Sequence, residues 1–314
     1  MPMETIIEQQ SRVNSQQSAI SDETLTDSGF YWREREGVKV LVCRPLEDAG
    51  FINGFSTRLG GVSPFPANDL NLAGFDEDTS ENIYENRRWF LNVFGGDLTL
   101  ATVWQVHGDG VKFVETVEDA ANSEEKFDAL VSKLPEVLVG VKTADCVPLL
   151  LGDPVNKAFG AIHAGWRGTV QSIAAKAIEK MVAAFGTSPA DLICAIGPAA
   201  TCRSYEIGQD VIDEFRAKFS TGGKYFTPTR NGHALVDLHL ANKDQLLGAG
   251  ISESNIFTAP FCTMERTDLF FSYRVEKKLN GKTGRLLSVI GFPQSRSLTV
   301  REGFFNADLK ESPS

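Results

Sequence analysis

The sequence has little of what several large classes of protein require. Only four of its 314 residues are histidine, and 41 acidic residues outnumber 31 lysines and arginines, so the formal net charge is −10. A chain with this charge lacks the basic surface on which nucleic-acid binding depends. No apolar run approaches the roughly 20 residues of a membrane-spanning helix. We therefore expect neither a nucleic acid nor a membrane as a partner.

Two further absences concern the cellular compartment and the cofactor. The first 30 residues lack the basic and apolar segments of a secretory signal. Five cysteines, an odd and scattered set, do not resemble a disulfide framework. We therefore expect a cytoplasmic protein with reduced thiols. The glycine fingerprints of a phosphate loop or a dinucleotide site are also absent, so neither type of nucleotide fold is expected.

The sequence that is present is typical of a folded, soluble protein. Its composition is 42% hydrophobic and 23% charged, as in globular domains. Residues 1–28 are rich in Ser, Gln, Glu and Thr and poor in apolar residues, which predicts a mobile N-terminal tail. Residues 29–314 contain no linker, repeat or charged block that divides them. We therefore expect them to form a single domain.

The hydrophobic pattern alternates between helical and strand-like periods. Helices are predicted over residues 80–95, 169–186, 208–219 and 238–250, the second with an apolar stripe that ends at Gly186. Short β-branched runs predict strands over residues 38–45, 101–108, 137–143, 147–153, 158–164, 192–197 and 286–292. This mixture predicts an α/β fold, a single layered domain with a mixed β-sheet flanked by helices.

Three residues on these strands are candidate metal ligands. If residues 153–156, "DPVN", form a symmetric turn, Cys146 lies directly opposite His163, with Cβ atoms about 5 Å apart. His107, at the end of the predicted strand 101–108, is the third candidate. One thiolate and two imidazoles suit zinc. The spacing alone favours a buried thiol and two hydrogen-bonded imidazoles over a metal site, and the hairpin pairing brings the two interpretations level. A one-residue slip in register would separate the pair.

Seven motifs occur in an order that resembles a known family. They are "STRLGGVS" (56–63), "WQVHG" (104–108), "DALVS" (128–132), "TADCVPLLL" (143–151), "HAGWRGT" (163–169), "GP…SYEIG" (197–208) and "FFSYR…TGR" (270–285). The sequence is similar to the bacterial laccase-domain family, also described as polyphenol oxidase, purine nucleoside phosphorylase or peptidoglycan editing factor. The resemblance covers about residues 37–295, and excludes the N-terminal tail.

The resemblance implies a fold, a metal and an activity. It implies a single α/β domain in which His107, Cys146 and His163 bind a zinc ion. It also implies phosphorolysis of adenosine, inosine and methylthioadenosine, with a purine nucleoside and inorganic phosphate as partners. The products are the free base and a ribose 1-phosphate. Adenosine deamination is a second activity that it implies.

The implied chemistry directs attention to two arginines and one carboxylate. Arg58 in the "STRLGG" loop and Arg167, just before a helix predicted to begin near Thr169, are the candidate phosphate ligands. Arg274 is a further candidate. For deamination, Asp145 is the candidate catalytic proton carrier. Because adjacent strand residues point to opposite faces, Asp145 can act beside Cys146 only where the strand bulges or ends.

Other interpretations of the same residues remain open. Cys146 is also suited to be the catalytic nucleophile of a metal-free hydrolase, with His163 or His107 as base and a peptidoglycan precursor as substrate. Copper is less favoured than zinc, because multicopper oxidation requires many imidazoles. A structural zinc module would need a fourth protein ligand. The sequence indicates neither the oligomeric state nor the preferred nucleoside.

Overall fold

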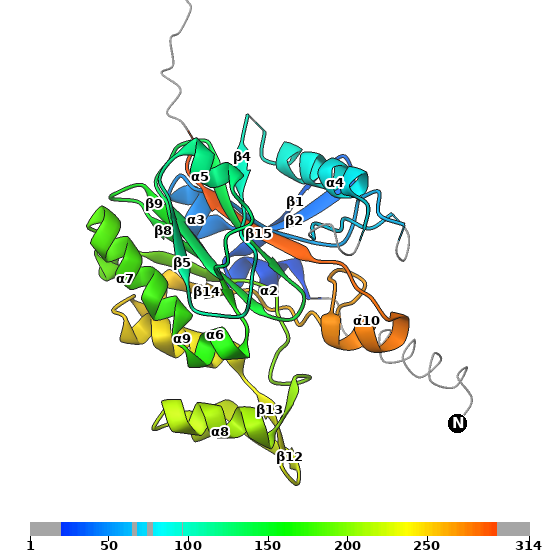
Figure 1. Ribbon diagram of the computed structural model, residues 1–314, viewed down its shortest axis with the longest axis vertical. Helices are drawn as coiled ribbons and strands as arrows, with labels where there is room; N and C mark the ends of the chain where they lie inside the picture. The colour runs from blue at the N-terminus through cyan, green and yellow to red at the C-terminus, as the bar shows by residue number, and fades with distance from the viewer. Residues whose placement is uncertain (1–19, 65–67, 74–77, 96, 294–314) are drawn as a thin grey trace, which may run out of the picture.

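Two six-stranded sheets form the centre of the computed structural model, which describes residues 20–64, 68–73, 78–95 and 97–293 (Figure 1). The first sheet has the order β1 (Phe30–Arg35), β2 (Val38–Cys43), β3 (Ile52–Ser56), β15 (Leu286–Gly291), β7 (Val137–Thr143) and β4 (Thr99–Ala101). The second has the order β14 (Ile256–Thr258), β10 (Ile193–Ile196), β8 (Val147–Asp153), β9 (Ala158–Ala164), β6 (Ala129–Ser132) and β5 (Val111–Val114). Both contain parallel and antiparallel pairs.

Helices cover the outer faces of the two stacked sheets (Figure 1). On the first sheet lies α4 (Ser80–Asn92), and on the second lie α7 (Ile173–Phe185) and α9 (Leu238–Gly248). The other helices are α2 (Asp22–Asp27), α3 (Arg44–Asp48), α5 (Val117–Ala121), α6 (Trp166–Val170), α8 (Gln209–Lys218) and α10 (Tyr273–Asn280), with short 3₁₀ turns at Pro189–Asp191, Gly222–Tyr225 and Glu253–Asn255. The predicted α/β class is confirmed, with two mixed sheets and a small antiparallel sheet instead of one mixed sheet.

The central strands are apolar on both faces because both faces are covered. In β8, Leu149 and Leu151 pack under the helices, whereas Leu150 packs between the sheets. In β9, Ile162 faces the helices and Ala161 faces the other sheet. A strand buried on two sides needs apolar residues at successive positions, which explains the continuous runs in the sequence.

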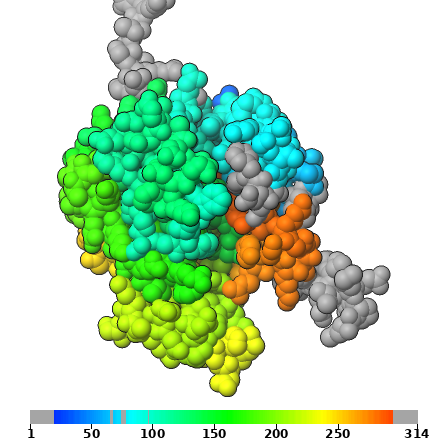
Figure 2. Space-filling model, viewed as in Figure 1, coloured from blue at the N-terminus to red at the C-terminus, as the bar shows by residue number. Residues whose placement is uncertain are grey.

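A small third sheet projects from this body (Figures 1 and 2). It has the order β11 (Glu206–Gly208), β13 (His233–Val236) and β12 (Phe226–Arg230), and α8 packs on it. No helix in the described part of the chain is long and apolar enough to cross a membrane.

Several sequence predictions need correction. The predicted tail 1–28 contains α2, whose Leu25 is buried, so a mobile tail is wrong for this helix; residues 1–19 lie outside the described residues. The predicted strand 101–108 is mostly loop beyond β4. The predicted helix 169–186 is two helices, because Ser172 takes a left-handed conformation with φ of 63°. Helix α7 does end at Gly186, as predicted.

The register of the β8–β9 hairpin also differs from the prediction. Asp153 pairs with Ala158, so four residues form the loop, and Pro148 lies opposite His163. The partners are therefore shifted by two residues from the predicted pairing of Cys146 with His163. A shift of two keeps the same face of the sheet, because side chains alternate with a period of two. His163 consequently remains on the inter-sheet face, and Cys146 directly precedes β8 at the same end of the hairpin.

Candidate metal centre

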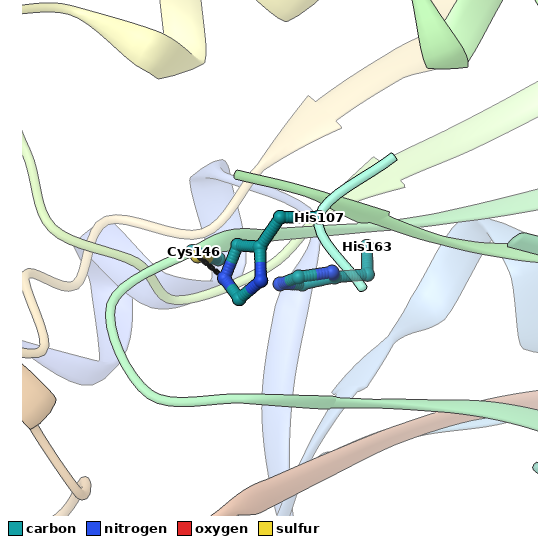
Figure 3. A group of neighbouring side chains, drawn as sticks. All are labelled: His107, Cys146 and His163. Carbon is teal, nitrogen blue, oxygen red and sulfur yellow. Dashed lines mark hydrogen bonds between the residues drawn. The ribbon is translucent and has the colours of Figure 1, made fainter. Parts of the chain in front are cut away.

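Three side chains from separate segments converge where β8 and β9 meet the loop after β4. They are His107, Cys146 and His163, and their candidate ligand atoms all lie within 4.8 Å of one another (Figure 3). The Sγ atom of Cys146 lies 3.8 Å from Nε2 of His107. The two imidazole rings have centroids 4.8 Å apart and meet edge to face at 77°. The predicted trio is thus close together, although the predicted hairpin register is wrong.

The donor set fits a zinc ion with an open position. Metal–ligand bonds of about 2.1–2.3 Å place tetrahedral ligand atoms about 3.6 Å apart, so the group needs to contract by about 1 Å. No fourth His, Cys, Asp or Glu among the described residues joins the group. His163 is buried, Cys146 is half-buried and His107 is exposed, so the group opens to solvent on the His107 side. Three protein ligands with an accessible fourth position are typical of catalytic zinc.

A buried carboxylate, Asp128, holds the two histidines in place. Its Oδ1 accepts a hydrogen bond from Nδ1 of His163 at 2.8 Å, which leaves Nε2 of that ring available to a metal. The same carboxylate accepts backbone N–H groups at Val106, His107 and Gly108. Sequence reasoning gave Asp128 no role. The available signal was an acidic residue directly before the apolar strand β6, at the start of the "DALVS" motif.

The charges in the group favour a thiolate beside an imidazolium when no metal is bound. Burial alone would raise the pKa of the Cys146 thiol, but the nearby His163 and His107 lower it to about 6. Burial would lower the pKa of His163, but the Cys146 thiolate and the Asp128 carboxylate raise it to about 9. Metal binding requires the thiolate and a neutral imidazole, so it would release the His163 proton.

Small residues in "HAGWRGT" make room for this arrangement. A Cβ atom on Gly165 would lie 3.0 Å from Cδ2 of His107 and 3.1 Å from Sγ of Cys146. A Cβ atom on Gly168 would lie 3.0 Å from the carbonyl oxygen of Gly108. The glycines therefore let β9 turn into α6 directly against the His107 loop.

Asp145 lies next to Cys146, but other groups occupy its carboxylate. It accepts hydrogen bonds from the Thr263 hydroxyl at 2.7 Å, the Ser272 hydroxyl at 3.1 Å and the Arg274 backbone N–H at 2.7 Å. Its φ is 86°, and it precedes β8, so strand alternation does not fix its direction. Burial raises the pKa of Asp145 against the effect of its three donors.

The two candidate phosphate ligands differ sharply in their surroundings. Arg58 is buried, and its guanidinium forms ion pairs with Asp69 and Glu276, at 2.8 and 2.7 Å. It also donates to the Thr267 carbonyl. These bonds give Arg58 a structural task in place of an exposed anion site. Arg167 instead is exposed in the first turn of α6, with its guanidinium 4.4 Å from the centre of the Trp166 ring.

Arg274 contacts Asp145 through its backbone N–H, which donates to the Asp145 carboxylate. Its side chain is exposed, donates to the Glu206 carbonyl and stacks over the Tyr205 ring at 4.9 Å. Burial, followed by the charge of Cys146, raises the pKa of Tyr205 to about 12, so this phenol lies within electrostatic range of the thiol. Tyr205 and Arg274 belong to the motifs "SYEIG" and "FFSYR", which are far apart in the sequence.

The chain is similar to known proteins along most of its length. The model of the family described as multicopper polyphenol oxidoreductase laccase matches residues 52–293. The chain belongs to this family. A purine nucleoside phosphorylase of Deinococcus radiodurans is 38% identical over 248 residues, which cover 79% of this chain and 91% of that protein. The purine nucleoside phosphorylase YfiH of Escherichia coli is 32% identical over 254 residues, with coverage of 80% and 98%.

Solved structures of similar proteins share the fold. YlmD from Geobacillus stearothermophilus superposes with a TM-score of 0.77 at 31% identity, and covers 85% of this chain and 99% of its own. A hypothetical protein YfiH of Bacillus licheniformis gives a TM-score of 0.76 at 30% identity, with coverage of 84% and 98%. The resemblance noted from the motifs is therefore confirmed.

The family's description mentions several copper ions, but this chain has few histidines that could bind them. The chain has four histidines, and two of them form the group with Cys146. His233 lies on β13, and His239, on α9, is bonded to the Gly197 carbonyl. Neither joins a second cluster of metal ligands among the residues that the structure describes. The family description alone therefore does not make this chain a multicopper oxidase.

Proposed function

We propose that this chain is a zinc-dependent purine nucleoside phosphorylase that acts on adenosine, inosine and methylthioadenosine. The observation that carries the proposal is the His107, Cys146 and His163 group, which is open on one side. The relatives named purine nucleoside phosphorylase are aligned over more than two thirds of this chain. Phosphate would attack the anomeric carbon, the bond to the purine nitrogen would break, and the base would leave with the electron pair.

The parts of this reaction divide among the residues of the chain. A zinc ion, when bound, would supply a fixed positive charge near the developing negative charge. Arg167 and Arg274 are exposed cationic groups, and we propose that they hold the phosphate. Arg58 is not included, because its guanidinium already compensates two buried carboxylates.

The test combines metal analysis with a phosphate-dependence assay. Purified protein is analysed for zinc and copper, and then incubated with adenosine or inosine with and without phosphate. We expect about one zinc per chain, and free base with ribose 1-phosphate only when phosphate is present. His107→Ala should lose both metal and activity, whereas the matched variant His233→Ala should keep both. Base release that is indifferent to phosphate would refute the assignment.

Adenosine deamination is a second proposed activity, and it involves Asp145. Burial raises the pKa of Asp145 from its ordinary value toward neutral pH, and this direction suits a group that takes up and releases protons. Its three hydrogen-bond donors would also hold it rigidly. If Asp145 carries protons, Asp145→Asn should abolish ammonia release from adenosine and leave phosphorolysis of inosine largely intact. Equal losses in both reactions would assign Asp145 to holding the Cys146 loop.

One observation favours a second candidate, a cysteine hydrolase acting on a peptidoglycan precursor. Cys146, His163 and Asp128 have the order of nucleophile, base and orienting carboxylate that cysteine hydrolases use. Alkylation by iodoacetamide discriminates between the two functions. In a zinc enzyme, bound zinc protects Cys146 and a chelator exposes it. In a hydrolase, Cys146 reacts rapidly at all times, and chelation changes neither labelling nor activity.

A further inference from the structure

The Asp128 carboxylate is an unusually saturated acceptor at the centre of the site. It is fully buried, and it accepts four N–H groups. Oδ2 accepts the backbone N–H groups of Val106 at 3.2 Å and Gly108 at 2.7 Å. Oδ1 accepts the backbone N–H of His107 at 2.9 Å and Nδ1 of His163 at 2.8 Å. Each of its oxygens is thus shared between two donors.

The three backbone donors determine the shape of the His107 loop. Successive N–H groups that point inward form a concave anion site, and here the anion is the carboxylate of Asp128. His107 itself has a φ of 59°, a left-handed conformation that is sparsely populated by residues other than glycine. Such a conformation persists only where surrounding contacts hold it. The Asp128 carboxylate supplies those contacts for His107, which is the exposed candidate metal ligand.

The fourth donor determines the state of His163. A carboxylate that accepts from Nδ1 favours the tautomer with the proton on Nδ1 and the lone pair on Nε2. The backbone carbonyl of Asp128 also accepts the backbone N–H of His163 at 2.7 Å. Asp128 therefore holds His163 both at its backbone N–H and at Nδ1 of its ring, with Nε2 on the side away from the carboxylate.

We propose that Asp128 is the positioning residue of the metal centre: it fixes the His107 loop and the His163 tautomer together, and thereby sets the affinity for the metal. This inference rests on the proposed metal site, and it does not depend on which substrate the site accepts. Asp128 is fully buried and is not one of the three candidate ligands, so it acts through the two histidines.

Asp128→Asn is the discriminating substitution, since it retains the shape and removes the charge. An amide has one acceptor oxygen and one NH₂ donor. With its NH₂ toward Val106 and Gly108, it opposes two N–H groups. With its NH₂ toward His163, the amide donates to Nδ1 and so favours the His163 tautomer with the proton on Nε2. A protonated Nε2 has no free lone pair with which to bind the metal. Both orientations therefore weaken the site.

Asp153→Asn provides the matched control. Asp153 is also fully buried, and its carboxylate accepts the backbone N–H groups of Val155 and Asn156 and the Asn156 side-chain amide. It lies at the opposite end of β8 from Cys146, about 20 Å away along the strand. The two variants thus make the same chemical change in similar surroundings, one beside the metal ligands and one far from them.

The readout is affinity for zinc and for cobalt, measured by competition with a chelator on folded protein. We expect Asp128→Asn to bind both ions about 10- to 100-fold more weakly than wild type. Its cobalt absorption spectrum should also change, because the ligand geometry changes. Asp153→Asn should keep wild-type affinity and spectrum even if it unfolds at a lower temperature. Wild-type affinity and spectrum in Asp128→Asn would overturn the proposal.

A measurement on the wild-type protein covers the case in which Asp128→Asn does not fold. In zinc-loaded protein with ¹⁵N-labelled histidine, long-range proton–nitrogen spectra identify which ring nitrogen carries the proton. We expect the His163 proton on Nδ1 and the metal on Nε2. The opposite assignment would refute the role of Asp128. Neither experiment includes a nucleoside, so an inactive phosphorylase would leave the outcome for Asp128 intact.

Discussion

Gly165→Ala tests whether the metal group must be as tightly packed as the structure indicates. Gly165 precedes α6 with φ of −69° and ψ of 172°, a conformation that alanine adopts readily. The added methyl group would lie 3.0 Å from His107 and 3.1 Å from the Cys146 sulfur. The substitution is thus a steric probe that points at two of the three ligands and leaves the backbone unstrained.

The expected effect follows from these distances. Carbon atoms in ordinary contact are about 3.5–4.0 Å apart, so His107 and Cys146 must each retreat by about 0.5 Å. Displacements of this size reach the tolerance of a preorganised site, which is about 0.5 Å, and a misplacement of about 1 Å costs about 100-fold in rate. We expect a 10- to 100-fold loss in both zinc affinity and kcat/KM for phosphorolysis. Stability of the metal-free protein should change by no more than about 1 kcal/mol.

Three measurements decide the outcome: chelator competition for zinc, initial rates of base release, and urea unfolding without metal. Gly248→Ala is the matched control, because a Cβ atom at this position in α9 meets no atom within 4 Å. It should leave all three quantities near wild type. If Gly165→Ala bound zinc and turned over inosine like wild type, the reasoning that places His107 and Cys146 against this glycine would be refuted.

Three further predictions concern stability. Arg58→Met should lower the free energy of unfolding by about 3–5 kcal/mol, because it leaves Asp69 and Glu276 buried without their cation; the KM for phosphate should stay unchanged, and a large rise would restore Arg58 as a phosphate ligand. Burial and the nearby Arg87 and Arg285 lower the pKa of Lys142 to about 8. The unfolded chain therefore binds more protons between about pH 8 and 10.5, so stability in urea should rise with pH over this interval, and less so in Lys142→Met. Zinc at 100 times its Kd should stabilise wild type by about 2.7 kcal/mol in thermal unfolding, and Cys146→Ala should show no such gain.

The parts of the fold that the sequence predicted are those whose apolar pattern reports burial directly. β8 and β9 were predicted with their observed bounds, because two covered faces require continuous apolar runs. Helix α7 was predicted from its stripe and its terminal Gly186. The break before α7 was missed, because a serine such as Ser172 does not indicate a left-handed conformation in the way that a glycine does.

The site was predicted less completely than the strands around it. The trio was found from the hairpin and the family motifs, but the turn was taken to be two residues too short. That error did not move His163 to the other face, because side-chain direction repeats every two residues along a strand. Asp128 was missed for a different reason: its four donors come from two segments that only the tertiary fold brings together. The positive charge of Arg58 suggested a phosphate ligand. Its partners Asp69 and Glu276 could not be identified from the sequence, because Glu276 lies far from Arg58 along the chain and only the fold buries the three together.

The geometry also gives a reason to prefer a metal over a free thiolate nucleophile. A cysteine hydrolase requires one histidine and one orienting group, and Cys146, His163 and Asp128 would suffice. The hydrolase mechanism would not require His107. This residue nevertheless has a left-handed backbone conformation, and its Nε2 lies 3.8 Å from the Cys146 sulfur. Asp128 holds this histidine with the same carboxylate that orients His163. A metal ion makes all three side chains necessary at once, so it accounts for the second imidazole and for the double duty of Asp128.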